Sequence, residues 1–380
     1  MRVIISAGGT GGHIYPALAI INKIKEEEPD SEILYIGTTD RMEKDLIPSL
    51  GYRYEALEVR GLKRKLTLDN IKTITCFISA IKKAKMIIKD FDPDIVIGCG
   101  GYVTAPVIYA AKKLGKKTFI HEQNSVVGLA NKFLSRYTDK VGVSFESTIK
   151  DFPKDKAVLT GNPCSEKALS IKPTTKEKLG LNKDKKLVLI VMGSLGSRSI
   201  NDKIFSFVDK FRGKNYNVII VTGNSYYDKV KDRRVPDNVK VLPFIYEMPS
   251  VMKITDLMVT RAGASTISEI TALEVPSIFI PSPYVVNNHQ YKNAMDLVST
   301  GAGIILEEKD MTDRSLIELI DKTLNDKDKL KEMAERTAAM LKITNQTQIK
   351  ISICKEIFTK TWSDMVRNGQ FPKEYEYLYD

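Results

Sequence analysis

The chain has 380 residues, of which 43% are hydrophobic and 28% are charged, and its formal net charge is +11. This length suits two domains with cores of their own, and the composition is that of a soluble globular protein. The excess of basic residues indicates an anionic partner, but charge alone does not choose among nucleic acid, anionic lipid and a phosphorylated compound.

The cysteines and the apolar runs exclude several classes of protein. Cys76, Cys99, Cys164 and Cys354 lie far apart without a C-x-x-C pair, so they suggest neither a zinc site nor a disulfide framework, and a reducing compartment fits. We expect no secretory signal region, and no apolar run approaches the length that spans a bilayer.

Residues 2–21 predict a strand, a glycine-rich loop and a helix. The β-branched run RVII precedes the loop, and apolar residues recur behind it at Ile14, Leu18 and Ile21. A helix N-terminus behind bare backbone presents unpaired N–H groups and partial positive charge, which suits a diphosphate or sugar hydroxyls. Because Ile14 stands where a G-x-G-x-x-G fingerprint needs its third glycine, NAD is disfavoured.

His13 ends this loop at the predicted helix N-terminus. The helix dipole disfavours a charged imidazole there, so His13 could take a proton from a sugar hydroxyl as a neutral general base. The alternative is a histidine that only caps or hydrogen-bonds the loop.

The segment 62–89 combines apolar residues at helical spacing with Lys82, Lys83, Lys85 and Lys89. A basic amphipathic helix of this kind can lie on an anionic membrane. It can equally be an ordinary helix that packs isoleucines on a sheet and exposes its lysines to solvent. Nucleic-acid binding is less favoured, because no known nucleic-acid module appears.

The D-x-D formed by Asp92 and Asp94 precedes the strand of 94–100 and is predicted to form a turn away from the site. We expect no metal site and no cofactor.

Both halves of the chain begin with a strand, a glycine loop and a helix, the second at 186–208. Short apolar runs then alternate with amphipathic segments, which is typical of βαβ units on parallel sheets. A polar, lysine-rich stretch at 162–186 has the composition of a linker. We predict domains at 1–160 and 161–342, with a helix and tail at 343–380 that return towards the first domain, and a ligand site in the cleft between the sheets.

Seven loops, taken together and in order, are similar to those of the MurG family of peptidoglycan N-acetylglucosaminyltransferases. They are GGTGGHIYPALA, GGYVTAP, IHEQNSVVGLANK, TGNP, GSLGSRSIN, TRAGASTISEI and NNHQYKNA. The resemblance implies a GT-B fold, with two Rossmann-like domains. It also implies inverting transfer of N-acetylglucosamine from UDP-GlcNAc to lipid I, which gives lipid II, by a peripheral protein at the cytoplasmic face of the cell membrane.

The resemblance also implies roles for single residues. His13 would be the base, Asn124 would contact the sugar, and Glu122 would either polarise the base or anchor its loop. The Ser194 hydroxyl and the nearby backbone N–H groups would hold the diphosphate in place of a metal, and Glu269 would accept both ribose hydroxyls. The other expected substrate-binding residues are Thr10, Gly11, Gly12, Ser165, Arg198, Ile245, Arg261, Ala264, His289 and Gln290.

Two positions depart from the family pattern. Cys164 and Ser165 stand where an arginine often follows the GNP turn, so Arg198 or Arg261 could supply that phosphate contact. Where some members have two glutamines, this chain has His289 and Gln290, and the sugar contact is carried over to Gln290 first.

Three alternatives stay open. The same fold could carry a UDP-GlcNAc 2-epimerase or a transferase with a different acceptor. It could also serve a non-catalytic UDP-sugar-binding protein, although His13 and Asn124 argue against that.

Overall fold

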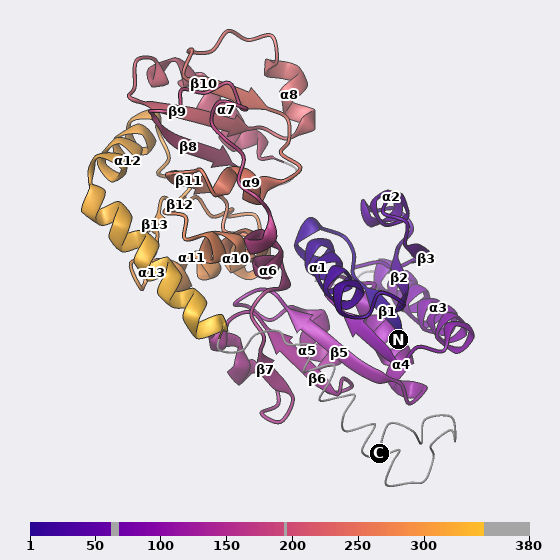
Figure 1. Ribbon diagram of the computed structural model, residues 1–380. Coiled ribbons are helices and arrows are strands. Elements are labelled where there is room, and N and C mark those ends of the chain that lie inside the picture. Colours follow the sequence, from indigo (N-terminus) through magenta and orange to yellow (C-terminus); the bar gives the residue numbers. More distant parts are fainter. Residues whose placement is uncertain (62–67, 194–195, 346–380) are drawn as a thin grey trace.

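The computed structural model describes residues 1–61, 68–193 and 196–345, and it contains two parallel β-sheets, each covered by helices on both faces (Figure 1). Their strands are short runs of valine, isoleucine and leucine, because both faces of a parallel sheet are buried. The α/β class and the pair of Rossmann-like domains are therefore confirmed.

The first sheet has the strand order β3-β2-β1-β4-β5-β6-β7. In register, Val3 pairs with Ile33 on one side and with Ile95 on the other. The strands are β1 (Arg2–Ser6), β2 (Glu32–Thr38), β3 (Arg53–Leu57), β4 (Ile95–Gly98), β5 (Lys117–Glu122), β6 (Lys140–Val143) and β7 (Ala157–Leu159). This order places the loops after β1, β4 and β5 side by side at one edge of the sheet.

Helices α1 and α2 cover one face of this sheet, and α3, α4 and α5 cover the other. Alternate residues of β1 enter the two cores, since Ile5 packs with Ile21 whereas Ile4 packs with Ile88. The bounds are α1 (Gly11–Glu27), α2 (Glu43–Ser49), α3 (Leu68–Phe91), α4 (Thr104–Lys113), α5 (Leu129–Leu134) and the 3-10 turn η1 (Glu146–Asp151).

The second sheet has the order β10-β9-β8-β11-β12-β13. Helices α7 and α12 pack on one face, and α9, α10 and α11 pack on the other. Its strands are β8 (Lys186–Val191), β9 (Tyr216–Val221), β10 (Val239–Leu242), β11 (Leu257–Thr260), β12 (Ser277–Phe279) and β13 (Ile304–Ile305). Its helices are α7 (Arg198–Ser206), η2 (Val208–Phe211), α8 (Asn224–Val230), α9 (Met248–Met252), α10 (Ala264–Leu273), η3 (Val286–Asn288), α11 (His289–Val298), α12 (Asp313–Asn325) and α13 (Lys327–Asn345).

Helix α6 (Pro163–Ser170) joins the two units and packs against α10 of the second and α1 of the first. The side chain of Asn162 caps this helix by accepting a hydrogen bond from the backbone of Cys164 at 3.1 Å. The predicted boundary at residue 160 falls between β7 and α6, and α13 descends along the second unit towards the first (Figure 1). Both domain limits stay predictions, and most of the 343–380 segment lies outside the described residues.

The predicted turn at the D-x-D motif is confirmed. Asp92 has a left-handed φ of 44° between α3 and β4, and it pairs with Lys116. Asp94 accepts a hydrogen bond from the backbone N–H of Arg2 at 2.7 Å, at the end of the sheet opposite the loops after β1 and β4. Within the described ranges, no helix is both long and apolar enough to cross a membrane.

Candidate functional site

The glycines of the loop after β4 are required by close packing against the first glycine loop and His13. The backbone N–H of Gly8 donates to the carbonyl of Gly100 at 3.2 Å. Gly100 and Gly101 have φ values of 105° and 88°, and a Cβ on Gly101 would overlap the carbonyl oxygen of Gly8. A Cβ on Gly100 would lie 2.6 Å from the ring of His13. The bare backbone therefore lets two loops close around one imidazole.

His13 is the third residue of α1, and its Nδ1 lies 3.1 Å from the carbonyl oxygen of Gly8. A carbonyl can only accept, so Nδ1 carries the proton and Nε2 keeps its lone pair. Burial lowers the pKa of His13, and the nearby His289 lowers it further, whereas Gly8, Glu122 and Glu43 raise it. Desolvation thus favours a neutral base, as predicted from the helix dipole but for a different main reason.

Glu43 is a site residue that the sequence reasoning missed. Its side chain is fully buried and accepts hydrogen bonds from the backbone N–H of Gly9 at 3.3 Å and from the Thr38 hydroxyl at 2.6 Å. A Cβ on Gly8 would lie 2.5 Å from its Oε1. Glu43 therefore holds the glycine loop in place through its hydrogen bonds. The only feature of the sequence that could have indicated this role is the position of an acidic residue shortly after the second strand.

Glu122, at the end of β5, anchors the loop that follows it. One carboxylate oxygen accepts from the backbone N–H of Asn124 at 3.0 Å, and the other accepts from Gly128 at 2.9 Å and from Asn131 at 3.0 Å. Of the two roles considered for Glu122, these contacts favour the anchor, and its charge reaches His13 only as a secondary influence on the pKa.

Asn124 and Ser125 join this loop to the second domain through Asn293 of α11. The fully buried Asn293 accepts from the backbone N–H of Ser125 at 2.9 Å and from its hydroxyl at 2.7 Å. Its amide nitrogen donates to Asn124 at 3.4 Å and to the carbonyl of Ala262 at 3.2 Å. Asn293 was also missed, although it lies in the NNHQYKNA motif, because a sequence cannot show which asparagine bridges two domains.

Glu269 lies on α10 and faces the first domain. Burial raises its pKa to about 7, and the positive charge of Lys167 opposes this shift. The pKa of Tyr15 is raised mainly by burial and, to a smaller extent, by the negative charge of Glu269. The carboxylate is thus set between α1, α6 and α10, where neighbouring donors could favour its ionised form.

The remaining second-domain candidates lie at loop ends. Ala264 is buried as the first residue of α10, which leaves its backbone N–H at a helix N-terminus. His289 and Gln290 begin α11, and Gln290 accepts from the backbone N–H of Ser282 at 2.8 Å. Ile245 lies partly buried in the loop after β10.

The two arginines differ in surroundings. Arg261 is buried, pairs with Glu308 at 2.6 Å and donates to the Ser197 hydroxyl at 3.0 Å, so it supports the second glycine loop. Arg198 is exposed on α7, beside Asp202. Arg198 is therefore the more accessible of the two for a phosphate.

Three further candidates were Thr10, the N-cap of α1, Ser165 of α6, and Ser194. Thr10 and the neighbouring Gly12 are exposed, and Ser165 lines a pocket between the domains. Ser194 lies outside the described residues. Across the described ranges, no group of three or more His, Cys, Asp and Glu side chains could hold a metal ion.

Two family models match the chain. The glycosyltransferase family 28 N-terminal domain matches residues 3–143, and the glycosyltransferase family 28 C-terminal domain matches residues 187–348.

Two curated relatives carry the name UDP-N-acetylglucosamine–N-acetylmuramyl-(pentapeptide) pyrophosphoryl-undecaprenol N-acetylglucosamine transferase. The protein from Bacillus cytotoxicus is 46% identical over 95% of this chain and 100% of its own length. The protein from Leuconostoc mesenteroides is 46% identical over 88% of this chain and 94% of its own length. Both therefore match most of this chain over nearly their whole length.

Solved structures resemble the fold. MurG from Acinetobacter baumannii has a TM-score of 0.70 and 30% identity, over 88% of this chain and 94% of that chain. A UDP-GlcNAc 2-epimerase from Neisseria meningitidis bound to UDP-GlcNAc has a TM-score of 0.63 at 16% identity, over 95% of this chain and 100% of that chain. At such low identity, the epimerase shows a common fold and nothing about the reaction.

Proposed function

The chain belongs to the MurG family of N-acetylglucosaminyltransferases, in glycosyltransferase family 28, and from this premise we propose how its site works. It is an enzyme that moves N-acetylglucosamine from UDP-GlcNAc to the MurNAc 4-hydroxyl of lipid I and forms lipid II. The observation that carries the mechanism is His13, whose Nδ1 is bonded to Gly8 while burial lowers its pKa.

His13 acts as the general base. Its Nε2 takes the proton of the acceptor hydroxyl as the oxygen attacks the anomeric carbon of the donor. The bond between that carbon and the diphosphate breaks, its electron pair leaves with UDP, and the configuration at the carbon inverts. Asn124 contacts the donor sugar from the first domain, where Glu122 holds its loop.

The second domain binds the nucleotide. The N-terminus of α10 and the backbone around Ile245 lie against the base and ribose, and Glu269 accepts the ribose hydroxyls. Gln290 contacts the sugar beside His289. The second glycine loop with Ser194 and Arg198 stabilises the diphosphate as it leaves, and Arg261 supports this loop through Ser197. Thr10, Gly11, Gly12 and Ser165 complete the substrate-binding set.

The test is a reconstitution with purified protein, UDP-GlcNAc and lipid I. We expect UDP and lipid II as products, and no UDP-N-acetylmannosamine when the acceptor is left out. Formation of that sugar nucleotide without acceptor would show an epimerase instead. Binding of UDP-GlcNAc without any turnover of lipid I would show a sugar-nucleotide-binding protein.

We further propose that α3 docks the enzyme on the cytoplasmic face of an anionic membrane. Ala84 and Ile88 of this helix pack in the core. Ile74 and Ile78 do not, and their side chains are 54% and 49% exposed. Exposed isoleucines on a helix rich in lysines have the chemistry of an interfacial helix. Residues 62–67 of the predicted segment lie outside the described residues.

The lysines of α3 can test this docking. Lys83 donates to the backbone carbonyl of Ala56 at 2.9 Å, so it is the matched control for Lys82, Lys85 and Lys89. Changing these three to Gln should remove about 1 kcal/mol of attraction each and weaken binding to anionic vesicles, with turnover of a water-soluble acceptor unchanged. Equal binding by the triple variant and by Lys83→Gln would contradict the proposal.

A further inference from the structure

Arg261 and Glu308 form a buried ion pair at the carboxyl-terminal edge of the second sheet. Arg261 directly follows β11 and Glu308 lies shortly after β13, so both belong to loops at that edge. Their exposed fractions are 6% and 8%, and Nη2 of the guanidinium lies 2.6 Å from Oε2 of the carboxylate. With so little exposed surface, the pair affects a ligand mainly through the residues around it.

Two serines connect this pair to the start of α7. Ser197 is the N-cap residue of α7, and its hydroxyl accepts from Nη2 of Arg261 at 3.0 Å. Ser199, in the first turn of the helix, donates to Oε1 of Glu308 at 2.7 Å, and the two serine oxygens lie 3.3 Å apart. Because Ser199 gives its one hydrogen to Glu308, the hydrogen between the serines comes from Ser197. The four side chains therefore form a closed ring of hydrogen bonds.

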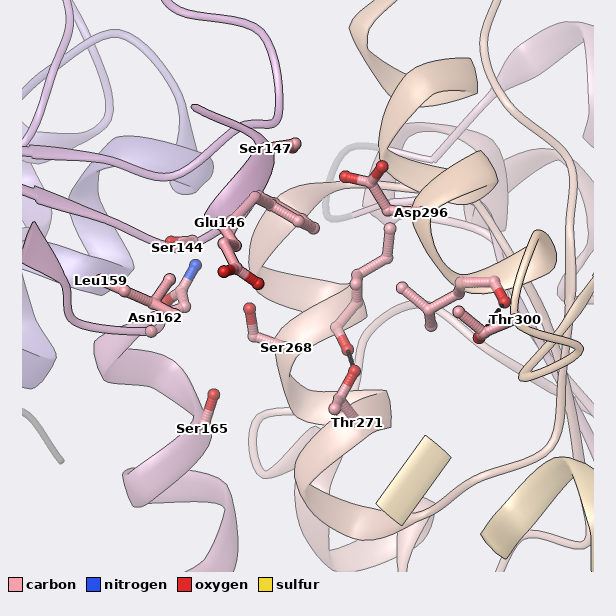
Figure 2. Close-up of a pocket in the computed structure, with 14 residues that line it drawn as sticks. Ser144, Glu146, Ser147, Leu159, Asn162, Ser165, Ser268, Thr271, Asp296 and Thr300 are labelled. Carbon is pink, nitrogen blue, oxygen red and sulfur yellow. Dashed lines mark hydrogen bonds between the residues drawn. The ribbon is translucent and has the colours of Figure 1, made fainter. Parts of the chain in front are cut away.

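Lys203 connects the same helix to the segment that carries Glu308. Its ammonium group donates to the carbonyl oxygens of Glu308 at 2.8 Å and of Met311 at 3.3 Å. Arg261 donates to the carbonyl oxygen of Ile280, after β12, at 3.0 Å. None of these residues lines the pocket between the domains that Figure 2 shows. The network therefore lies within the second domain and fixes the start of α7 relative to the loops after β11, β12 and β13.

Glu308 carries a negative charge in this network. Burial by itself would raise the pKa of Glu308, but the hydrogen bonds from Ser199 and Arg261 and the charges of Arg261 and Lys203 together lower it. The carboxylate is therefore ionised at neutral pH and neutralises the guanidinium of Arg261. A glutamine of the same shape could still accept one hydrogen bond, but it would leave that buried positive charge unpaired.

We propose that Glu308 is a positioning residue for the diphosphate of the donor. It orients Arg261 and Ser199, and these side chains hold the first turn of α7 behind the second glycine loop. Ser197 and Ser199 flank Arg198, which stabilises the leaving diphosphate in the proposed function, and the inference rests on that function. Glu308 itself does not touch the substrate, and it acts by fixing groups that do.

The direction of the effect distinguishes positioning from a simple effect of charge. Removing the negative charge of Glu308 makes the surroundings of the diphosphate more positive, which by itself would strengthen UDP binding. Loss of the fixed geometry at the start of α7 would weaken UDP binding instead. The two explanations therefore predict opposite changes in the affinity for UDP.

The test is titration calorimetry of the full chain with UDP and with uridine, which has no phosphate. We expect Glu308→Gln to weaken UDP binding about tenfold, because the groups that meet the diphosphate lose their orientation. Binding of uridine should stay unchanged, whereas a merely structural role would weaken both ligands or neither. Unchanged or tighter binding of UDP would overturn the proposal, as would an equal loss for uridine.

Ser199→Ala tests the same link without leaving a buried charge unpaired, so the fold is not at risk. It should weaken UDP binding about threefold, the size expected for one hydrogen bond. The double variant should bind UDP no more weakly than Glu308→Gln alone, because Ser199 acts through Glu308. Additive losses would show that the two residues act independently and would overturn the proposal.

Asp321→Asn is the matched control. Asp321 is also a partly buried carboxylate of the second domain, where it accepts from Tyr216 at 2.9 Å and pairs with Lys214 at 2.6 Å. Tyr216 begins β9, so this group lies at the opposite edge of the sheet from Glu308. The variant should bind UDP like the wild type, and a loss equal to that of Glu308→Gln would overturn the proposal. Absence of UDP binding by the wild type would contradict the proposed function as well.

Discussion

Glu43 and Glu122 of the first domain and Glu269 of the second domain have contrasting surroundings. In the first domain, Glu43 and Glu122 accept hydrogen bonds from the backbone of the loops beside them. In the second, burial raises the pKa of Glu269 to about 7, so that carboxyl group is partly protonated near neutral pH.

This difference distinguishes carboxylates that hold a loop in place from a carboxyl group that binds a ligand. A carboxylate that already accepts several hydrogen bonds holds its loop in one conformation before any ligand arrives. A carboxyl group with a raised pKa gains most when a ligand brings donors to it, because those donors favour the ionised form. The first domain thus fixes the base, and the second responds to the nucleotide.

His13→Ala should have the largest effect, because it removes the base that the first domain holds in place. We expect turnover to fall about 10² to 10⁴-fold while the affinity for UDP-GlcNAc stays nearly unchanged. Steady-state kinetics with lipid I, together with calorimetry of donor binding, would check this. His289→Ala is the matched control from the second domain, and a loss of similar size there would contradict the assignment of the base.

Glu43→Gln should destabilise the protein by about 3 kcal/mol at pH 7.5, since hydrogen bonds to a charged group contribute about 1.5 to 3 kcal/mol each. Urea unfolding would measure the loss. Glu269→Gln serves as the comparison and should not destabilise at this pH. If both variants lose the same free energy of unfolding, the proposed contrast between Glu43 and Glu269 is wrong.

Glu269 should also give the second domain a dependence on pH. Because its pKa in the folded protein is raised above the usual value, its contribution to stability is present below about pH 4.5 and is lost as the pH rises through 7. The shift of the pKa from 4.5 to about 7 corresponds to a loss of stability of at most about 3 kcal/mol. Because the side chain of Glu269 is partly exposed to solvent, we expect a loss of about 2 kcal/mol. The difference in urea midpoint between wild type and Glu269→Gln, followed from pH 4 to 8, would reveal it.

Donor binding should change with pH in the opposite sense. Ribose hydroxyls donate to the ionised carboxylate, so the affinity for UDP-GlcNAc should increase by up to about tenfold between pH 6 and pH 8. Glu269→Gln should remove this increase. An unchanged pH profile in the variant would mean that Glu269 does not contact the ribose.

Asn293→Ala should have the smallest effect, because it cuts a contact between the domains and leaves both cores intact. We expect a loss of about 1 kcal/mol, typical of a neutral hydrogen bond. Hydrogen exchange should show the loop of Ser125 opening more readily while α1 stays protected. Equal loss of protection in both places would show global unfolding instead.

Much of the fold and several parts of the site follow from local sequence. Runs such as RVII and KLVLIV alternate with amphipathic segments, and this periodicity alone predicts two parallel sheets with helices on both faces. The D-x-D turn and the position of His13 behind a glycine loop are equally local, because each depends on a few adjacent residues.

The tertiary structure decided which side chains meet across long separations in the chain. Glu43 accepts a hydrogen bond from the backbone N–H of Gly9, and Asn293 accepts one from the hydroxyl of Ser125, 168 residues away in the chain. Arg261 is a candidate for the phosphate contact in the sequence, but in the structure it is buried against Glu308. The charge state of Glu269 depends on burial between α1, α6 and α10, and desolvation arises only when the helices pack together, so no local pattern of residues encodes it.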